Sequence, residues 1–477
     1  MFENVSLIIG GEDRRNGSAG TVDVFDPATG EMIASLPRAN GSEAREAARL
    51  AVEGFEEWSA LAPFDRYKIL RQAAEVMRGK ADEAAAITTR EQGKPLAQAK
   101  LEWLASTDLL DWSAEEGRRT YGRLVPPRAS SISLSVVQRP VGPVALMAPW
   151  NFPSWGPMQK IAPALAAGCS IVVKPSEDTP ITAWLVCKCL LDAGVPGKAI
   201  SIIWGNAAEI SDALIKAPEI RKVSLTGSIR VGRIVAAAAG EQLKKVTMEL
   251  GGHAPVIVAE DADLDALVPL ATTGKFRNAG QVCISPTRFL VADKIHDEFL
   301  ERFVGETKKV VVGLGSDPAT QMGPLTTLGQ LQAIDTLVKD AVSKGGILET
   351  GGERIGNIGN FYPPTIVSGA TSSMKAMNDE PFGPLALVAK VDSIDAALEE
   401  ANRLPVGLGS YAFTRSDETA ARIARGIKVG MLGINHFTLG LPETPFGGVL
   451  DSGFGSEGGV EAVQCYMSPM LVTHKHF

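Results

Sequence analysis

Residues 144–174 read VALMAPWNFPSWGPMQKIAPALAAGCSIVVK, and their pattern points to an α/β fold. A short apolar run, VALMA, is followed by a helical stretch, MQKIAPALAAG, and by a second apolar run, SIVVK. Continuous apolar runs of this length are typical of strands buried on both faces, and a helix between two such strands indicates a βαβ unit. Gly168 stands where the C-cap of that helix is expected, just before the second run.

The same alternation continues along the chain. The runs AISIIW, KVSLTG and KVTME are further strand candidates, and helical stretches such as ITAWLVCKCLLDAG lie between the strands. This predicts a Rossmann-like parallel sheet with helices on both faces, which binds its ligands at the carboxyl ends of its strands. After Gly251 a second α/β pattern begins, with the strand candidates APVIVA, TRFLVA, PTIVSGA, LALVAKV, SYAFT and KVGMLGIN.

The remaining segments complete the expected organisation. Residues 43–117 carry apolar side chains at three- and four-residue spacing, which predicts helices. SISLSVVQRPVG, from Ser131, alternates and predicts a strand in a hairpin, and the final MLVTHKHF also reads as a strand. We therefore expect a cofactor-binding domain of residues 1–121 and 141–251, a catalytic domain of residues 252–466, and a small β element of residues 122–140 and 467–477.

Composition excludes several classes of protein. The 477 residues carry a net charge of -8, which argues against a broad nucleic-acid-binding face. No apolar run is long enough for a transmembrane helix, and MFENVSLIIGGEDRR lacks the features of a signal peptide, so no membrane association is predicted. Five cysteines are a sparse, odd set that indicates a reducing compartment, and the cytoplasm is the expected location. Cys187 and Cys189 face different sides of a helix, so we expect buried thiols, and no metal site is predicted.

Polar residues follow two of the expected strands. Asn151, in APWNFP, is displayed after VALMA on a backbone held extended by two prolines, although a simple turn would explain that stretch alone. Lys174 and Glu177, in KPSEDTP, emerge after SIVVK, where a carboxylate is suited to accept hydrogen bonds from ribose hydroxyls. A solvated charge pair is the alternative for that pair.

Two more strand ends carry candidate residues. Gly227 permits close approach and Ser228 is a good N-cap in LTGSIRVG, so the following helix could hold a phosphate, although the pattern is not G-x-G-x-x-G. Glu249 ends the apolar run in VTMELGG, where partial burial would raise its pKa towards the range of a general base. A hydrogen-bonded structural role is the alternative.

Cys283 lies in FRNAGQVCISPTR, among small and polar residues that suit neither a helix interior nor a disulfide framework. A thiol nucleophile usually has a histidine as its base, but neither His253 nor His296 forms a recognisable pair with it. Glu249 is then the candidate for the missing base.

Seven motifs in order, PWNFP, AAGCSIVVKPSE, LTGS, MELGG, FRNAGQVC, EPFGP and PFGG, resemble the aldehyde dehydrogenase superfamily over nearly the whole chain, and EQGKP at 91–95 fits as well. The resemblance implies that Cys283 adds to an aldehyde carbon, and that Asn151 and the Cys283 backbone N–H form the oxyanion hole. Hydride transfer to the nicotinamide leaves a thioester, and Glu249 activates the water that hydrolyses it. The thiol itself is expected to be activated mainly by its electrostatic surroundings.

The resemblance also implies the cofactor contacts. Lys174 and Glu177, with Ser176 in the same loop, match the adenosine-ribose ligands, and Gly227 and Ser228 match the pyrophosphate region. Glu380 and Phe382 match the nicotinamide-ribose contacts, and Trp150 lines the same path. Because a glutamate at 177 would repel a 2′-phosphate, NAD is favoured, with NADP as the alternative. Relatives of this kind form homodimers or homotetramers through the hairpin at 122–140 and the C-terminal strand.

Two departures concern the substrate. Leu450 stands where a lysine is usual and Ser456 where many relatives carry arginine, and DSGFGSEGG is similar to a bacterial group of succinate-semialdehyde dehydrogenase-like members. In the true semialdehyde enzymes two arginines hold the substrate carboxylate. Arg277 matches one of them and Gln159 stands at the other, so a semialdehyde remains open, and a structural ion pair is the alternative for Arg277.

Two other functions are alternatives to this interpretation. A CoA-acylating relative would pass the thioester to CoA and needs no water-activating carboxylate, so Glu249 argues against it. A catalytically silent NAD-binding scaffold of the same fold would have no reason to keep Asn151, Glu249 and Cys283 together.

Overall fold

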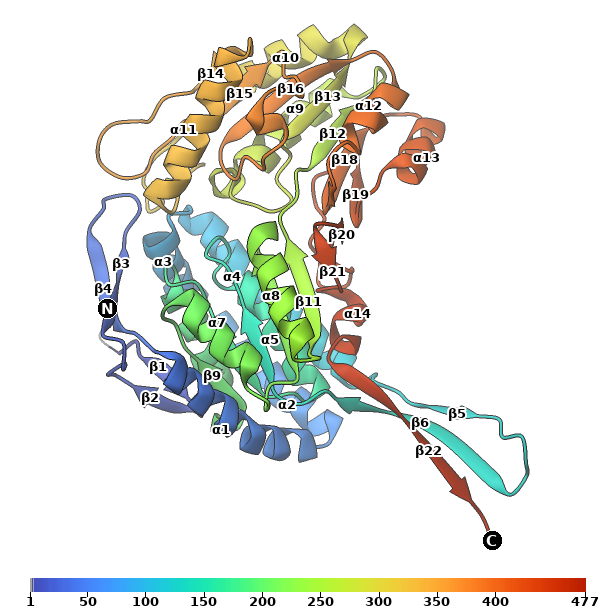
Figure 1. Cartoon of the computed structure of the whole chain (residues 1–477). Helices are drawn as coiled ribbons and strands as arrows, with labels where there is room; N and C mark the ends of the chain where they lie inside the picture. The colour runs from blue at the N-terminus through green and yellow to red at the C-terminus, as the bar shows by residue number, and fades with distance from the viewer. Residues whose placement is uncertain (1, 3) are drawn as a thin grey trace.

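The computed structural model describes residue 2 and residues 4–477, which form two large sheets (Figure 1). Each of these sheets has its own hydrophobic core. The first sheet has eight strands in the order β2-β1-β9-β8-β7-β10-β11-β21. The five central strands, β9, β8, β7, β10 and β11, run parallel, and each corresponds to one of the predicted apolar runs. Their bounds are β2 Glu12–Arg14, β1 Leu7–Ile9, β9 Ile200–Ile202, β8 Ile171–Lys174, β7 Val144–Met147, β10 Lys222–Gly227, β11 Lys245–Leu250 and β21 Gly453–Phe454.

Helices connect these strands and precede them. The connecting helices are α5 Trp155–Ala167, α6 Pro180–Asp192, α7 Ala207–Lys216 and α8 Ile229–Glu241, and the preceding ones are α1 Gly41–Ala60, α2 Pro63–Gly79, α3 Ala81–Gln92 and α4 Leu96–Gly117. Helix α1 starts at a capping box, in which the Asn40 side chain accepts from the Glu43 backbone N–H and the Glu43 carboxylate accepts from the Asn40 N–H. Gly168, with φ of 99°, ends α5 in the left-handed conformation, as predicted for this C-cap.

The strand order of the first sheet contains a topological switch point. From β7 the chain moves outward through β8 to β9, and it then crosses to the other side of β7 to form β10 and β11. The connections therefore diverge between β7 and β10, and open α/β sheets bind ligands at the carboxyl ends of the strands at such a switch point.

The second sheet has seven strands in the order β14-β15-β16-β13-β12-β18-β19, all parallel except β14. Its strands are β14 Ile347–Thr350, β15 Thr365–Ser368, β16 Leu385–Val391, β13 Arg288–Ala292, β12 Pro255–Val258, β18 Gly409–Phe413 and β19 Met431–Ile434. Its helices are α9 Leu264–Phe276, α10 Asp293–Thr307, α11 Leu328–Ser343, α12 Ile394–Ala401 and α13 Asp417–Gly426. The predicted second α/β pattern is thus present.

A three-stranded sheet, formed by β5 Arg123–Val125, β6 Ile132–Pro140 and β22 Met467–Lys475, extends away from the two large sheets (Figure 1). β6 and β22 pair antiparallel along their whole lengths. Just before β22, the chain returns to the first sheet, because β21 pairs with β11, and Val463 and Tyr466 around α14 Gly459–Gln464 pack into the first core. These residues lie within the range predicted for the second domain.

Two small antiparallel sheets lie outside these three sheets. One is the hairpin of β3 Thr21–Phe25 with β4 Met32–Pro37, and the other pairs β17 Val406–Gly407 with the distant β20 Val449–Leu450. Among the described residues, no helix has the length and apolar character needed to cross a membrane.

Candidate active site

One cavity of about 390 Å³ brings together the three residues predicted to carry the chemistry, Asn151, Glu249 and Cys283. Asn151 follows β7 and Glu249 lies near the end of β11, so both come from the first sheet at its carboxyl edge. Cys283 lies between α9 and β13 of the second sheet. The structure therefore places the three side chains at one site, although they are far apart in the sequence.

A rigid turn presents Cys283. After α9, a 3-10 turn at Arg277–Gly280 places Asn278, Ala279 and Gly280 in the left-handed region, with φ of 51°, 53° and 71°. For non-glycine residues this conformation costs about 1–3 kcal/mol each and persists only where the surroundings enforce it. At Gly280 a Cβ would lie 2.1 Å from the backbone oxygen of Gly383, so only glycine fits against that segment.

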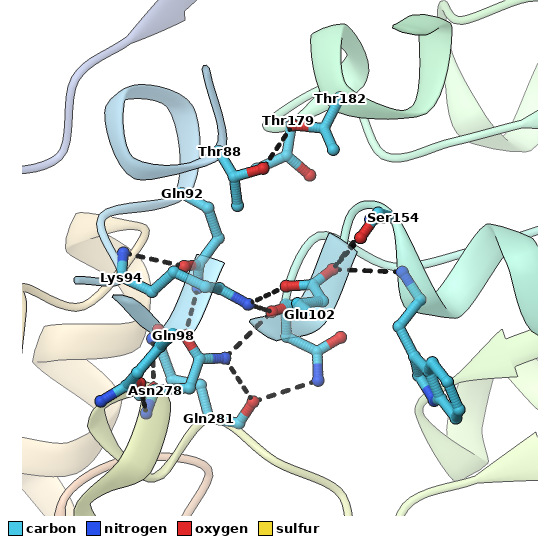
Figure 2. Close-up of polar contacts among 12 residues, drawn as sticks. Thr88, Gln92, Lys94, Gln98, Glu102, Ser154, Thr179, Thr182, Asn278 and Gln281 are labelled. Atoms are coloured by element: carbon cyan, nitrogen blue, oxygen red, sulfur yellow. Dashed lines mark hydrogen bonds and ion pairs between the residues drawn. The ribbon is translucent and has the colours of Figure 1, made fainter. Parts of the chain in front are cut away.

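Asn151 is fixed through both its backbone and its side chain. Its carbonyl oxygen accepts hydrogen bonds from Lys94 Nζ and from Asn278 Nδ2, each at 2.9 Å. Its own Nδ2 donates to the carbonyl oxygen of Gln281 at 3.1 Å. A carboxamide nitrogen carries two protons, so the second N–H of Asn151 is free to donate into the cavity. Figure 2 shows Lys94, Asn278 and Gln281 among the polar contacts of this region.

Glu249 is buried, and its Oε1 atom has no hydrogen-bond partner in the part of the chain that the structure describes. The pKa of the Glu249 carboxyl is raised to about 8, mainly by burial and next by the nearby Glu457 carboxylate. The Lys160 ammonium acts in the opposite direction. Lys160 in turn forms a buried ion pair with Glu457 and donates to Thr226 on β10.

The electrostatic surroundings of Cys283 differ from the expectation. Burial raises the pKa of the Cys283 thiol well above its usual value, and the carboxylates of Glu249 and Glu380 raise it further. The prediction that these surroundings activate the thiol is therefore wrong, since negative neighbours disfavour a thiolate. Glu249 lines the same cavity as Cys283, and its carboxylate is one of those that act on the thiol.

The predicted cofactor residues lie around the switch point of the first sheet. Trp150 follows β7. Lys174 is the last residue of β8, and Ser176 and Glu177 follow it. Gly227 is the last residue of β10, and Ser228 comes just before α8. Ser228 caps α8, because its Oγ accepts from the Val231 N–H at 3.3 Å. From the side of the second sheet, the ring of Phe382 meets that of Trp150 edge-on with 5.6 Å between centroids, and Glu380 lies near Glu249.

A sequence profile described as the aldehyde dehydrogenase family matches residues 14–472 of the chain. The chain belongs to the aldehyde dehydrogenase family. It is 40% identical over 467 residues to a 4-(hydroxymethyl)benzenesulfonate dehydrogenase from Comamonas testosteroni, covering 98% of this chain and 97% of that protein. It is also 40% identical to the mitochondrial succinate-semialdehyde dehydrogenase of Arabidopsis thaliana, covering 96% and 87% of the two proteins. A crystal structure described as an NADP-dependent enzyme from E. coli superimposes with a TM-score of 0.97 at 35% identity, covering 98% of both chains.

As an aldehyde dehydrogenase, the protein is an oxidoreductase whose family uses NAD or NADP. Its residues fit a dinucleotide of this kind. Glu177 Oε1 is buried without a hydrogen-bond partner among the described residues, as expected of an acceptor for a ribose hydroxyl. The N-terminus of α8 at Ser228 is suited to hold a phosphate. Arg38 places its Nε 4.0 Å from Glu177 Oε1, so a cation also lies beside this carboxylate.

Arg277 lines the cavity, and its side chain is exposed. Its guanidinium carbon lies 5.9 Å from the centroid of the Phe152 ring, and it forms no ion pair within the described chain. The structure therefore gives no support to the alternative of a structural ion pair. Gln159, the neutral residue at the second predicted position, lines the same cavity from α5.

Sequence reasoning missed four charged residues around this aldehyde dehydrogenase site: Lys94, Glu102, Lys160 and Glu457. A lysine inside the otherwise apolar helix MQKIAPALAAG is a signal for Lys160, because an unpaired lysine is rarely fully buried. Glu457 gave no local signal, since its partner lies 297 residues away.

Proposed function

We propose that this aldehyde dehydrogenase oxidises its substrate to a carboxylate through a covalent intermediate on Cys283. The observation that carries the proposal is the cavity shared by Cys283, Asn151 and Glu249. The Cys283 sulfur bonds to the aldehyde carbon while its proton passes to Glu249, and the new oxyanion accepts hydrogen bonds from Asn151 Nδ2 and the Cys283 N–H. When bound, the nicotinamide cofactor supplies the hydride acceptor that converts this thiohemiacetal to a thioester.

Glu249 then serves the second half of the reaction. Once the proton taken from Cys283 has passed to solvent, Glu249 takes a proton from water, whose oxygen attacks the thioester carbon. It then returns this proton to the departing Cys283 sulfur, which restores the thiol, and the carboxylic acid product loses its own proton to solvent. A pKa of about 8 suits this role, because a group that titrates near neutral pH can both accept and return a proton.

We further propose that the substrate carries a negative charge at the end remote from the aldehyde. Arg277 supports this, since it is a cation at the cavity without a carboxylate partner in the described chain. The printed names of two relatives point the same way, because 4-(hydroxymethyl)benzenesulfonate and succinic semialdehyde are both anions. Gln159 supplies an amide instead of a second cation, so a single charge contact with Arg277 is expected.

For the cofactor we propose NAD, because the Glu177 carboxylate would lie where a 2′-phosphate is carried. The nearby Arg38 partly offsets that repulsion. We also propose that the sheet formed by β5, β6 and β22 joins subunits into a homodimer or homotetramer, since it projects from the protein and exposes the apolar side chains of Leu124 and Leu471. The five cysteines are all free, which agrees with the cytoplasmic location proposed for the protein.

The test is a panel of aldehydes in matched pairs, with formation of reduced cofactor followed by absorbance in NAD and NADP. Succinic semialdehyde is paired with butanal, and 4-formylbenzenesulfonate with benzaldehyde. We expect the anionic member of at least one pair to have the higher kcat/KM, and Cys283→Ala to abolish turnover. Equal kcat/KM within both pairs would remove the role of Arg277, and retained turnover in Cys283→Ala would remove the covalent mechanism. Formation of acyl-CoA on addition of CoA would instead identify a CoA-acylating enzyme.

A further inference from the structure

A buried ion pair next to the cavity has no part in the proposed reaction. Lys94, in the loop between α3 and α4, pairs with Glu102 on α4, and the two side chains are only 1% and 3% exposed. Burying two charges costs several kcal/mol per ion unless hydrogen bonds satisfy them, so such a pair is weak evidence for stability alone. The groups that Lys94 and Glu102 contact therefore indicate what the ion pair does.

Glu102 fixes the C-terminal end of the segment from Asn151 to Trp155, where α5 begins. Its Oε1 accepts hydrogen bonds from the Ser154 N–H at 2.9 Å, the Ser154 hydroxyl at 2.9 Å and the Trp155 N–H at 3.1 Å (Figure 2). The side chain of Ser154, at the N-cap position, does not cap the helix itself. A carboxylate from another helix thus satisfies the first N–H groups of α5, where a negative charge is favourable.

Lys94 fixes the other end of the same segment. Its Nζ donates to the Asn151 carbonyl oxygen at 2.9 Å and lies 4.1 Å from the centroid of the Phe152 ring. The segment from Asn151 to Trp155 is therefore held at its start by the cation and at its end by the carboxylate of one ion pair.

The turn that presents Cys283 shares this anchor. Asn278 Nδ2 donates to the same Asn151 carbonyl oxygen at 2.9 Å, and Asn278 Oδ1 accepts from Gln92 Nε2 at 2.9 Å. Asn151 Nδ2 and the Cys283 N–H must point at one oxygen atom to act as an oxyanion hole, so their relative position matters. The Asn151 carbonyl is the point where the ion pair and the cysteine turn meet.

We propose that Lys94 and Glu102 are positioning residues that hold the Asn151 side-chain amide where it and the Cys283 N–H can donate to the same oxygen atom. This inference rests on the proposed function, in which Asn151 donates to the oxyanion. Without Lys94 the Asn151 carbonyl loses one of its two donors, and without the Glu102 charge the start of α5 loses its cap. A displacement of about 1 Å in such a site can cost on the order of 10²-fold in rate.

The test compares Lys94→Met and Glu102→Gln in the wild-type and Asn151→Ala backgrounds. We expect each variant to lower kcat by about tenfold to 10²-fold, while the KM of the aldehyde and the Kd of the cofactor change by less than about threefold, since the effect is on the transition state. In the Asn151→Ala background the further loss should be less than about twofold, because residues acting through one group are not additive. Equal losses in the two backgrounds would show that the pair does not act through Asn151.

Glu91→Gln is the matched control. Glu91 is also a buried carboxylate from α3 that accepts from the first N–H groups of another helix, those of Ile181 at 2.9 Å and Thr182 at 2.8 Å. We expect it to lower the melting temperature but to keep kcat within about twofold, as a structural cap would. A loss of kcat in Glu91→Gln as large as in Glu102→Gln would overturn the proposal.

A readout without turnover separates this inference from the proposed function. Amide hydrogen exchange at residues 151–155 should be faster in Lys94→Met and Glu102→Gln than in the wild type and in Glu91→Gln. Unchanged exchange in both variants would refute the positioning role, whereas absence of wild-type turnover on every aldehyde would refute only the proposed function. If a single variant does not fold, Lys94→Met/Glu102→Leu removes both charges together, a change that proteins often tolerate.

Discussion

The pH dependence of turnover tests the role of Glu249 most directly. With a pKa of about 8, the Glu249 carboxyl is about one tenth ionised at pH 7 and about nine tenths ionised at pH 9. If the ionised form is the base for thioester hydrolysis, kcat should rise about tenfold between these two pH values. Glu249→Gln should lose this rise, and its kcat should be lower by about 10²–10⁴-fold, the usual contribution of a general base.

The neighbouring carboxylate offers a second perturbation of the same group. Glu457 raises the pKa of Glu249, and Lys160 lowers it. Glu457→Gln removes the like charge and leaves the Lys160 ammonium without its partner. Both changes favour the ionised form of Glu249, so the midpoint of the pH profile should move to lower pH.

The assay is kcat at saturating aldehyde and cofactor from pH 6 to 10, with rapid-mixing measurement of the first turnover to separate formation of the reduced cofactor from hydrolysis. Glu91 is a buried carboxyl whose pKa is raised to about 7, mainly by burial, and it does not line the cavity. The variant Glu91→Gln should therefore keep the wild-type pH profile. A flat wild-type profile, or the same rise in Glu249→Gln, would refute the assignment of the base.

The same pKa has a consequence for stability. The folded pKa of about 8 lies above the usual value of a glutamate in an unfolded chain, so the folded state binds the proton more tightly. The free energy of unfolding should therefore fall as pH rises from about 4.5 to about 8, and Glu249→Gln should reduce that slope in denaturant titrations at several pH values.

Four further changes have defined outcomes. Cys283→Ser should retain cofactor binding by fluorescence titration but lose aldehyde oxidation, and wild-type rates in this variant would contradict a thiol nucleophile. Arg277→Gln should raise the KM of anionic aldehydes by about tenfold or more and leave neutral ones unchanged, as steady-state kinetics would show. Glu177→Gln should raise kcat/KM with NADP relative to NAD, because Arg38 then faces a 2′-phosphate without a competing carboxylate. Gly280→Ala should lower the melting temperature and kcat together, since a Cβ would lie 2.1 Å from a backbone oxygen.

The parts of the fold that were predictable follow from local pattern. The five runs of the first sheet are strands because a strand buried on both faces must be apolar throughout, as in β7, where all four residues are buried. Gly168 ends α5 because the left-handed region favours glycine. The short strands β1 and β21 could not be found this way. β1 and β21 add to the edges of the first sheet through long-range pairing, which leaves no period in the sequence.

The residues of the site also fall into those that local sequence could predict and those that it could not. Asn151 and Glu249 could be placed at one sheet edge because each follows or ends a recognisable strand of that sheet. The pKa of Cys283 could not be anticipated, since it depends on Glu249 and Glu380, which approach the thiol only in the folded chain. The ion pair of Lys94 and Glu102 was equally hidden, although Lys94 lies in the quoted motif EQGKP, because its meaning depends on contacts with the segment after β7.

The position of β21 has a consequence for biosynthesis. β11, which carries Glu249, lies between β10 and β21, and β21 comes from residues 453–454, more than 200 residues later in the chain. Glu457, which tunes the proton affinity of Glu249, follows directly. A ribosome that has released only the first 440 residues therefore holds a nascent chain in which β11 has β10 on one side and no partner strand on the other, so the surroundings of Glu249 are completed only late in translation.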